Sequence, residues 1–339
     1  MSESLYRKYR PAKFKDVIGQ DHVVKVLEAE VGSGNISHAY LFSGTRGTGK
    51  TSVARIFAKE IGTTQNDIYE IDAASNTSVD DIRSLNESVF TLPFESKYKV
   101  YILDEVHMLS KSASNALLKT LEEPPSHVVF ILATTETHKI PETVLSRCEV
   151  FTFKKPSEET LKKVALNISK KEGYSIEDSS AELIALLGDG SFRDTQGILQ
   201  KVLSYTKDKK ISEEEVRLVT GAPSVELVHE ILESISEKKL ENGLNAVKKA
   251  VSQNIDMSVF LKLILQTTRA VLLVRFGTEN SVKNKLSEKE FEFVSKIAKA
   301  SGDFSSKTLI ELLNSYERVG TSYIPSLPLE LALINIINS

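Results

Sequence analysis

The sequence predicts an α/β domain with a five-stranded parallel sheet, followed by two domains built only from helices. Two observations carry this prediction. Short apolar runs alternate with helical patterns in the first half of the chain, which is typical of a parallel sheet with helices on both faces. After Pro156 the pattern changes to helices alone. A linker-like segment at Gly221–Ser224 divides this helical half, so the expected domains span residues 1–156, 157–222 and 223–339.

The composition is that of a soluble globular protein. With 339 residues the chain has room for two or three domains and a sizeable core. Basic and acidic side chains nearly balance to a net charge of −3, so any contact with nucleic acid must come from local patches. The single cysteine, Cys148, excludes an internal disulfide and a cysteine-based zinc cluster within the monomer, and it favours the cytoplasm.

No membrane segment is expected. The N-terminal stretch MSESLYRKYRP lacks the apolar region of a secretory signal. The most apolar long stretch, Met257–Phe276, is interrupted by Lys262, Gln266, Arg269 and Arg275 at helical intervals. We therefore expect a buried helix there rather than a membrane span.

Five apolar runs form the expected strands. Their continuous rather than alternating apolar character fits strands that are buried on both faces. Ligands then collect at the carboxyl ends of the strands. The expected strands are Ala39–Ser43, Ile68–Ile71, Val100–Leu103, Val128–Ala133 and Val150–Phe153.

The first strand leads directly into a glycine-rich turn. The stretch AYLFSGTRGTGKT fits the phosphate-loop pattern G-x-x-x-x-G-K-[ST], with a chance glycine loop as the alternative. Glycines let the backbone wrap an anion closely, and the helix that follows turns its N-terminus towards the phosphates. Lys50 is expected to meet the β- and γ-phosphates, and Thr51 to hold Mg²⁺ through its hydroxyl. The expected nucleotide-binding residues of this loop are Gly44, Thr45, Arg46, Gly47, Thr48, Gly49, Lys50, Thr51 and Ser52.

An acidic pair follows the third expected strand, in KVYILDEVHML. We expect Asp104 to complete the Mg²⁺ shell through water and Glu105 to polarise the attacking water, because phosphoryl transfer needs positioning and charge stabilisation. The alternative is a solvated acidic turn. His107 is interpreted as a hydrogen-bonded structural residue rather than a metal ligand.

A hydroxyl follows the fourth expected strand. Thr135 is expected to contact the γ-phosphate or to orient the water, with a local Ser/Thr turn as the alternative. In PETVLSRC, Pro141 opens a short expected helix and Arg147 lies near its exit.

The first twenty residues are locally basic, and Pro11 enforces an extended bend after Arg10. Two interpretations stay open, a solvated basic arm and a wall on the base side of the nucleotide pocket. The residues of this expected wall are Tyr6, Arg10, Pro11, Val17 and Ile18.

Helical patterns fill the rest of the chain, and no strand is expected there. Arg193 lies at the start of the third of these helices, and the polar stretch Ser281–Lys289 is expected to be a solvated loop. The expected helices are Ser157–Glu172, Ser179–Leu187, Phe192–Thr206, Val225–Glu237, Leu240–Gln253, Met257–Phe276, Glu288–Lys299, Ser306–Gly320 and Leu329–Asn338.

Several motifs occur together and in order: LYRKYRPAKFKDVIGQ, GTRGTGKTSVARIFAK, YILDEVHMLS, NALLKTLEEPP, FILATTETHKIP and LSRCEVF. On these motifs the chain closely resembles the gamma/tau subunits of bacterial DNA polymerase III, the ATPases of the sliding-clamp loader. The resemblance is dense over residues 4–222 and is one of helical pattern alone over 223–339. It implies an AAA+ P-loop domain, an all-α lid domain and an all-α collar domain through which subunits form a pentameric ring.

The resemblance also implies roles for single residues. It makes Gly44–Thr51 the Walker A loop, Asp104 and Glu105 the Walker B pair, Thr135 the first sensor, Arg147 the arginine finger and Arg193 the second sensor.

The chain departs from the family at two places. Where members commonly carry a four-cysteine zinc module, this chain has IGTTQNDIYEI with no cysteine, so no zinc site is expected. Where some members carry basic residues, this chain has Ala74–Ser78 with none. Hydroxyls, amides and helix N-termini can still hold DNA phosphates there.

The function that the resemblance implies is an ATPase that couples ATP binding and hydrolysis, with Mg²⁺, to loading of the clamp onto primer-template DNA. The implied partners are the other clamp-loader subunits, the sliding clamp and DNA bound without sequence preference, with polymerase and helicase reached through a further C-terminal tail. One alternative is a non-hydrolysing scaffold subunit, which would lack Lys50 or the acidic pair. Another is an AAA+ translocase for branched DNA, which would share the ATPase chemistry but not the EEPP and SRC context.

Overall fold

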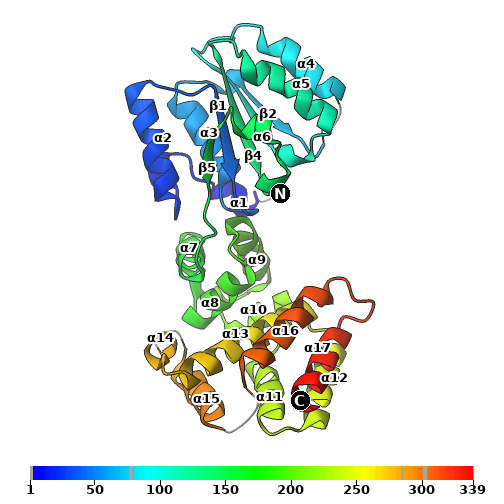
Figure 1. Cartoon of the computed structure of the whole chain (residues 1–339). Coiled ribbons are helices and arrows are strands. Elements are labelled where there is room, and N and C mark those ends of the chain that lie inside the picture. The colour runs from blue at the N-terminus through cyan, green and yellow to red at the C-terminus, as the bar shows by residue number, and fades with distance from the viewer. Residues whose placement is uncertain (1–2, 76–78, 284–285, 301–303, 339) are drawn as a thin grey trace. The chain divides into compact units, whose positions relative to one another are not determined.

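The computed structural model describes residues 3–75, 79–283, 286–300 and 304–338. By its internal contacts the chain divides into two compact units, Met1–Ile211 and Ser212–Ser339. Figure 1 shows the helices and strands of both units. Each unit has hydrophobic core residues of its own.

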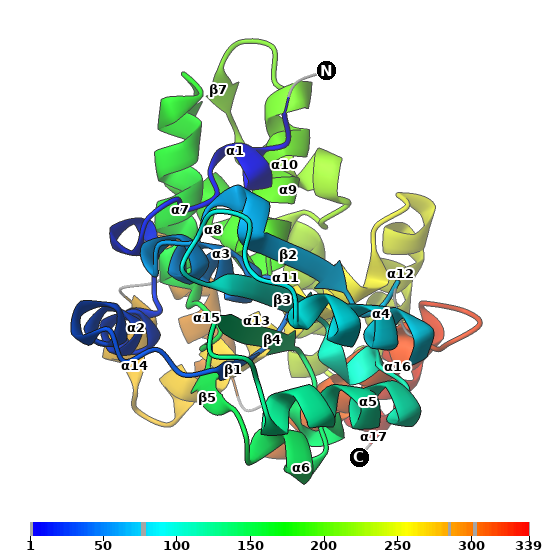
Figure 2. The same ribbon diagram turned by 90° about the horizontal axis from the view of Figure 1, so that it is seen from above.

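The first unit is built on a five-stranded sheet in the order β2-β3-β4-β1-β5, which Figure 2 shows from above. Every neighbouring pair of strands in this sheet is parallel. All five predicted strands are confirmed, each to within one residue of its expected bounds. They are β1 (Ala39–Ser43), β2 (Ile68–Asp72), β3 (Lys99–Asp104), β4 (Val128–Thr134) and β5 (Glu149–Thr152).

Helices cover both faces of this sheet (Figure 1). Along β1, Tyr40 and Phe42 belong to the core on one face and Leu41 to the core on the other, and all three are fully buried. Burial on both faces explains why the central strands β1, β3 and β4 are mostly apolar, whereas the edge strands β2 and β5 are largely exposed. The covering helices are α2 (Asp21–Ser33) and α3 (Lys50–Glu60) on the first face, and α4 (Val79–Val89) and α5 (Lys111–Glu122) on the second.

The carboxyl ends of the strands meet at one edge of the sheet. Ser43 at the end of β1 lies opposite Thr134 of β4, and Asp72 at the end of β2 lies opposite Asp104 of β3. The predicted motifs therefore start from neighbouring strand ends. The short elements of this unit are α1 (Leu5–Lys8), α6 (Glu142–Leu145), and the 3₁₀ turns Phe14–Asp16, Gln65–Asp67, Val106–Met108 and Thr137–Lys139.

Three helices complete the first unit, close to the predicted positions: α7 (Glu158–Lys171), α8 (Asp178–Leu187) and α9 (Phe192–Tyr205). The expectation that no strand follows Pro156 is wrong at two short segments. The strands β6 (Ser175–Ile176) and β7 (Lys210–Ile211) pair in parallel. Each has only two residues, too few for a hydrophobic period to be recognised in sequence.

The second unit is entirely helical in its described residues. Its six predicted helices are confirmed. Two more helices are present: α14 overlaps the start of the stretch Ser281–Lys289 that was expected to be a loop, and α10 was not predicted. Helix α10 lies in this unit by its contacts, while the predicted division into three domains stays a prediction. The helices are α10 (Glu213–Thr220), α11 (Val225–Ser236), α12 (Leu240–Ser252), α13 (Met257–Arg275), α14 (Glu279–Lys283), α15 (Glu288–Lys299), α16 (Ser306–Val319) and α17 (Leu327–Asn338).

Helix α13 is, among the described residues, the one helix long and apolar enough by length and composition to cross a membrane. Core helices of soluble proteins meet the same criteria. Phe260, Leu261 and Ile264 of α13 are fully buried in the core of the second unit. Its packing is that of the buried helix expected from the sequence.

Candidate functional site

The glycine-rich loop connects β1 to α3 with three glycines at positive φ: Gly44 (147°), Gly47 (74°) and Gly49 (102°). Other residues rarely adopt this conformation. A Cβ on Gly44 would also lie 2.6 Å from the carbonyl oxygen of Phe153, and one on Gly47 would lie 1.9 Å from Oγ of Ser191. The loop therefore requires glycine for conformation and for space.

Lys50 begins α3 and is only 5% exposed. Its Nζ donates hydrogen bonds to the carbonyl oxygens of Gly44 (2.8 Å) and Thr45 (3.1 Å). Burial lowers the pKa of Lys50, opposed by the nearby carboxylates of Glu105 and Asp104. Within the described chain, none of these carboxylates is in ion-pair range of the ammonium, so it is available to phosphate oxygens.

The N-terminus of α3 also fits an anion. Its N-cap is Gly49, which has no side chain to cap the helix. The amide groups of the first turn of a helix have no partner within the helix and attract negative charge. Thr45 and Arg46 of the loop are exposed, whereas Thr48 is buried and donates from Oγ1 to the Thr45 carbonyl (2.9 Å).

Thr51 and Asp104 meet from α3 and the end of β3. The Oγ1 of Thr51 donates to Oδ2 of Asp104 at 2.7 Å, although the two residues are 53 positions apart. The Oδ1 of Asp104 accepts a bond from the backbone amide of Glu105 (3.1 Å). A hydroxyl and a carboxylate beside a phosphate loop are oxygen ligands of the type that Mg²⁺ prefers, so these residues fit the expected ion.

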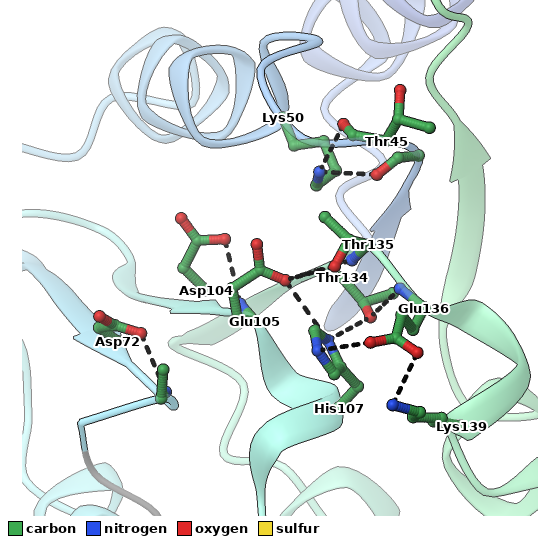
Figure 3. A network of polar contacts seen from close by, with 12 residues as sticks. Thr45, Lys50, Asp72, Asp104, Glu105, His107, Thr134, Thr135, Glu136 and Lys139 are labelled. Carbon is green, nitrogen blue, oxygen red and sulfur yellow. Dashed lines mark hydrogen bonds and ion pairs between the residues drawn. The ribbon is translucent and has the colours of Figure 1, made fainter. Parts of the chain in front are cut away.

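Glu105 and Thr135 come from neighbouring strands and contact each other (Figure 3). The Oε2 of Glu105 accepts bonds from the backbone N (3.3 Å) and Oγ1 (3.0 Å) of Thr135. Glu105 lies at a φ of 52°, in the left-handed region that residues other than glycine rarely adopt. Two residues singled out in sequence are thus in direct contact at the edge where the phosphate loop begins.

The start of α9 contacts the phosphate loop. The backbone amide of Phe192 donates to the carbonyl of Gly47 (2.9 Å), and Ser191 caps the helix by accepting from the amide of Asp194. The guanidinium of Arg193 lies 5.0 Å from the ring centre of Tyr6. The structure therefore brings together two residues that the sequence assigned to the nucleotide pocket from opposite ends of the first unit.

Two family models match the chain. One, described as DNA polymerase III, delta subunit, matches residues 19–77 and 63–157. The other, described as DNA polymerase III subunits gamma and tau domain III, matches residues 211–339.

One curated relative aligns with most of this chain and over most of its own length. The DNA polymerase III subunit gamma of Buchnera aphidicola is 37% identical over 292 residues, which cover 80% of this chain and 79% of the relative. The chain belongs to the DNA polymerase III gamma/tau family.

Longer relatives agree with this gamma/tau assignment. The DNA polymerase III subunit tau of Bacillus subtilis is 37% identical over 358 residues, covering 98% of this chain and 63% of the relative. The tau subunit of Escherichia coli is 37% identical over 80% of this chain and 46% of the relative. The gamma/tau chain thus spans only part of the length of these two relatives.

A solved structure supports the fold. The RuvB Holliday junction branch migration motor of Thermotoga maritima has a TM-score of 0.54 and 25% identity, covering 68% of this chain and 80% of that chain. With the five-stranded parallel sheet, this likeness supports the predicted AAA+ fold of the gamma/tau chain.

In this gamma/tau chain His107, which the sequence analysis interpreted as a structural residue, lies beside Glu105. Its Nδ1 lies 3.1 Å from Oγ1 of Thr134 and 3.3 Å from Oε2 of Glu105. Its Nε2 lies 3.4 Å from Oε1 of Glu136. The histidine is hydrogen-bonded, as expected, and its partners include the predicted catalytic carboxylate. Its position two residues after that carboxylate was the available signal.

The N-terminal segment of the gamma/tau chain contacts helices α7 and α9 of the first unit. Leu5 is buried and its amide donates to Oε1 of Gln200 on α9 (3.0 Å). Lys8 pairs with Glu172 at the end of α7 (2.7 Å), and the hydroxyl of Tyr9 donates to the same carboxylate. No local sequence pattern indicated that Glu172 and Gln200 contact the N-terminal segment.

Further along this segment, Gln20 bonds to Lys154, which follows the edge strand β5. Gln20 is 1% exposed and both donates to the carbonyl of Lys154 (2.7 Å) and accepts from its amide (3.0 Å). Besides Tyr6, the residues of the predicted base-side wall differ in environment. Arg10, Pro11 and Val17 are half-buried, whereas Ile18 is 47% exposed.

Arg147 lies between α6 and β5. Its guanidinium donates to the carbonyl of Thr143 (2.7 Å), to Oγ of Ser146 (3.2 Å) and to Oε1 of Glu122 (2.6 Å). In the described part of this gamma/tau chain, none of its partners belongs to the phosphate loop.

No group of three or more His, Cys, Asp or Glu side chains is placed to hold a metal ion in the described ranges. Burial raises the pKa of the Cys148 thiol to about 12. The expected absence of zinc stays a prediction. Of the stretch expected to contact DNA through uncharged groups, Asn76, Thr77 and Ser78 lie outside the described residues.

Proposed function

We propose that the chain is the ATPase subunit of a bacterial sliding-clamp loader and couples ATP binding and hydrolysis to loading of the clamp onto primer-template DNA. One observation carries the proposal. Lys50, the Thr51–Asp104 pair and the Glu105–Thr135 pair gather at adjacent strand ends beside a loop that requires glycine. Membership of the gamma/tau family supports it, although the chain spans 63% and 46% of two of its tau relatives.

In this proposal the loop binds the ATP phosphates. The backbone amides of Gly44–Ser52 donate to phosphate oxygens, and Lys50 exchanges its two carbonyl partners for the β- and γ-phosphates. Thr51 and Asp104 hold Mg²⁺, which when bound neutralises charge on the phosphates.

Glu105 activates the water. Its carboxylate accepts the proton as the water oxygen bonds to the γ-phosphorus, and the bond from that phosphorus to ADP breaks. Thr135 orients the carboxylate through its amide and its hydroxyl.

The lid and the N-terminal segment close the pocket. Tyr6, Arg10, Pro11, Val17 and Ile18 form the wall on the base side, and Arg193 moves with α9 to reach the γ-phosphate. The direct bond between Phe192 and Gly47 supports a link between the lid and the phosphate loop.

Arg147 acts on the ATP of a neighbouring subunit in the pentameric ring. Its position away from its own phosphate loop, on a short segment after α6, supports action in trans. Such an arginine stabilises charge on the transferring phosphoryl group.

Residues 223–339, which make up most of the second unit, form the collar, and the division into domains at residues 156 and 222 is part of the proposal. The chain assembles with other clamp-loader subunits and the clamp in the cytoplasm. It holds DNA by phosphate contacts, so binding is independent of sequence and weakens with salt.

A clamp-loading assay tests the proposal. With partner subunits, clamp and circular primed DNA, the wild-type chain should retain clamp on DNA only when ATP is present. Lys50→Ala should load none. Loading at the normal rate by Lys50→Ala would favour a non-hydrolysing scaffold subunit. ATP-driven migration of a four-way DNA junction without clamp loading would favour a translocase for branched DNA, the candidate suggested by the fold likeness to RuvB.

A further inference from the structure

We propose that His107 is a positioning residue for Glu105: its ring anchors one carboxylate oxygen of Glu105 so that the other oxygen faces the attacking water. The inference rests on the proposed function and deepens it. It adds to the site a residue from the 3₁₀ turn after β3, whose contacts tie the carboxylate to the segment after β4 (Figure 3).

The first step concerns the two oxygens of the Glu105 carboxylate. All of its side-chain contacts use Oε2, which accepts from the amide and hydroxyl of Thr135 and lies 3.3 Å from Nδ1 of His107. In the part of the chain that the structure describes, Oε1 has no hydrogen-bond partner. The side chain of Glu105 is 30% exposed, so this oxygen is open to a water molecule. An anchor on one oxygen orients the other.

The second step concerns how firmly His107 is held. Its side chain is 7% exposed. Its Nδ1 contacts Oγ1 of Thr134 at 3.1 Å, and its Nε2 lies 3.4 Å from Oε1 of Glu136. The ring is therefore buried and hydrogen-bonded at Nδ1, which restricts its orientation as an anchor for a catalytic group requires.

Glu136 is itself fixed. Its backbone amide donates to Oγ1 of Thr134 (3.0 Å) and its other carboxylate oxygen pairs with Lys139 (2.7 Å). The hydrogen bond from Lys139 lowers the pKa of Glu136, so its carboxyl is ionised at neutral pH. The contacts form a continuous line from Lys139 through Glu136 and His107 to Glu105.

The third step assigns the proton. The Nδ1 of His107 faces two oxygens, Oε2 of Glu105 and Oγ1 of Thr134, and a carboxylate oxygen can only accept. The proton on Nδ1 is assigned from these contacts, since hydrogen atoms are placed by their partners.

The test exploits the two ring nitrogens. An asparagine amide nitrogen takes the place of Nδ1, while a glutamine amide nitrogen reaches the place of Nε2. In the full chain assembled with partner subunits, clamp and DNA, His107→Ala and His107→Gln should lower the kcat of ATP hydrolysis by about 10- to 100-fold. His107→Asn should stay within about threefold of wild type, because it restores the donor to Glu105. Affinity for a non-hydrolysable ATP analogue and the thermal unfolding midpoint should be unchanged in all three.

Two controls separate the possible failures. His138→Ala removes an exposed histidine that also lies near Glu136 (3.7 Å), and it should leave kcat unchanged. Glu105→Gln should abolish hydrolysis while ATP still binds. A normal kcat in His107→Ala, an equal loss in the asparagine and glutamine variants, or a loss of nucleotide affinity in all three would overturn the inference. Normal hydrolysis by Glu105→Gln would instead contradict the proposed function.

Discussion

Lys50 donates its hydrogen bonds to carbonyls of its own loop, and we expect it to exchange them for phosphate oxygens when ATP binds. Lys50→Ala should lower the affinity for an ATP analogue by about 10- to 100-fold, since bonds to a charged group contribute about 1.5–3 kcal/mol. A fluorescence titration measures this. Lys59→Ala, an exposed lysine on the same helix, is the control and should bind normally. Equal affinity of the two variants for the ATP analogue would show that Lys50 does not contribute to ATP binding.

At the scale of elements, the N-terminal helix α1 is attached to the lid through Glu172, whose pKa lies below its usual range because Lys8 and Tyr9 donate to it. If this segment forms the base side of the pocket, Glu172→Ala should lower ATP-analogue affinity about fivefold, the loss expected for one partly exposed hydrogen-bonded contact. The control is Lys170→Ala, at an exposed residue near the end of α7, and it should leave the affinity unchanged. An unchanged affinity in Glu172→Ala would show that attachment of α1 does not shape the pocket.

A second element-scale prediction concerns the loop between α4 and β3. Asp67 is fully buried and accepts bonds from the consecutive amides of Phe94, Glu95 (3.0 Å) and Ser96 (2.9 Å). Burial alone would raise its pKa, but these bonds outweigh burial and bring the pKa to about 2. Because this value lies below that of the unfolded chain, the carboxylate stabilises the fold above about pH 4, by about 2 kcal/mol. The contribution is lost as the pH falls towards 2.

Asp67→Asn tests this assignment by denaturant unfolding. The variant should lose about 2 kcal/mol at pH 7, and the difference from wild type should shrink by about half at pH 3. Asp80→Asn, at an exposed aspartate, should behave like wild type at both values. A difference that is the same at pH 7 and pH 3 would mean that the charge of Asp67 does not stabilise the loop.

At the scale of the whole molecule, sequence predicted the sheet and the motifs that follow its strands. The strands were predictable because β1, β3 and β4 are buried apolar runs, and the motifs begin within a few residues of the strand ends. The loop glycines, Thr51 and Asp104 belong to such motifs. Gln20 and Glu172 were not predicted, because their partners lie 134 and 164 residues away. The contacts of His107 were not predicted for the same reason, since Thr134 ends β4 and Glu136 follows it.

Substitution of Arg147 tests whether ATP hydrolysis depends on a neighbouring subunit in the assembled ring. Arg147→Ala should bind ATP but lose hydrolysis stimulated by DNA and clamp, since an arginine supplied in trans accelerates phosphoryl transfer, by about 10³–10⁵ in GTPases. Mixing Arg147→Ala with Lys50→Ala protein, in the presence of partner subunits, should restore activity above the sum of the two. In mixed rings the first variant offers an intact pocket and the second offers the missing guanidinium. Co-assembly without restored activity would mean that Arg147 acts within its own subunit or only structurally.

The most direct test of the ATPase proposal is the rate of ATP hydrolysis by Glu105→Gln in the assembled complex, measured beside its ATP affinity. The substitution removes the proton acceptor and keeps the size of the side chain. We expect unchanged ATP affinity and a rate about 10²- to 10⁴-fold lower, the loss typical of a missing general base. Hydrolysis at the wild-type rate with ATP bound at this site would contradict the proposal that Glu105 and the phosphate loop form the ATPase centre.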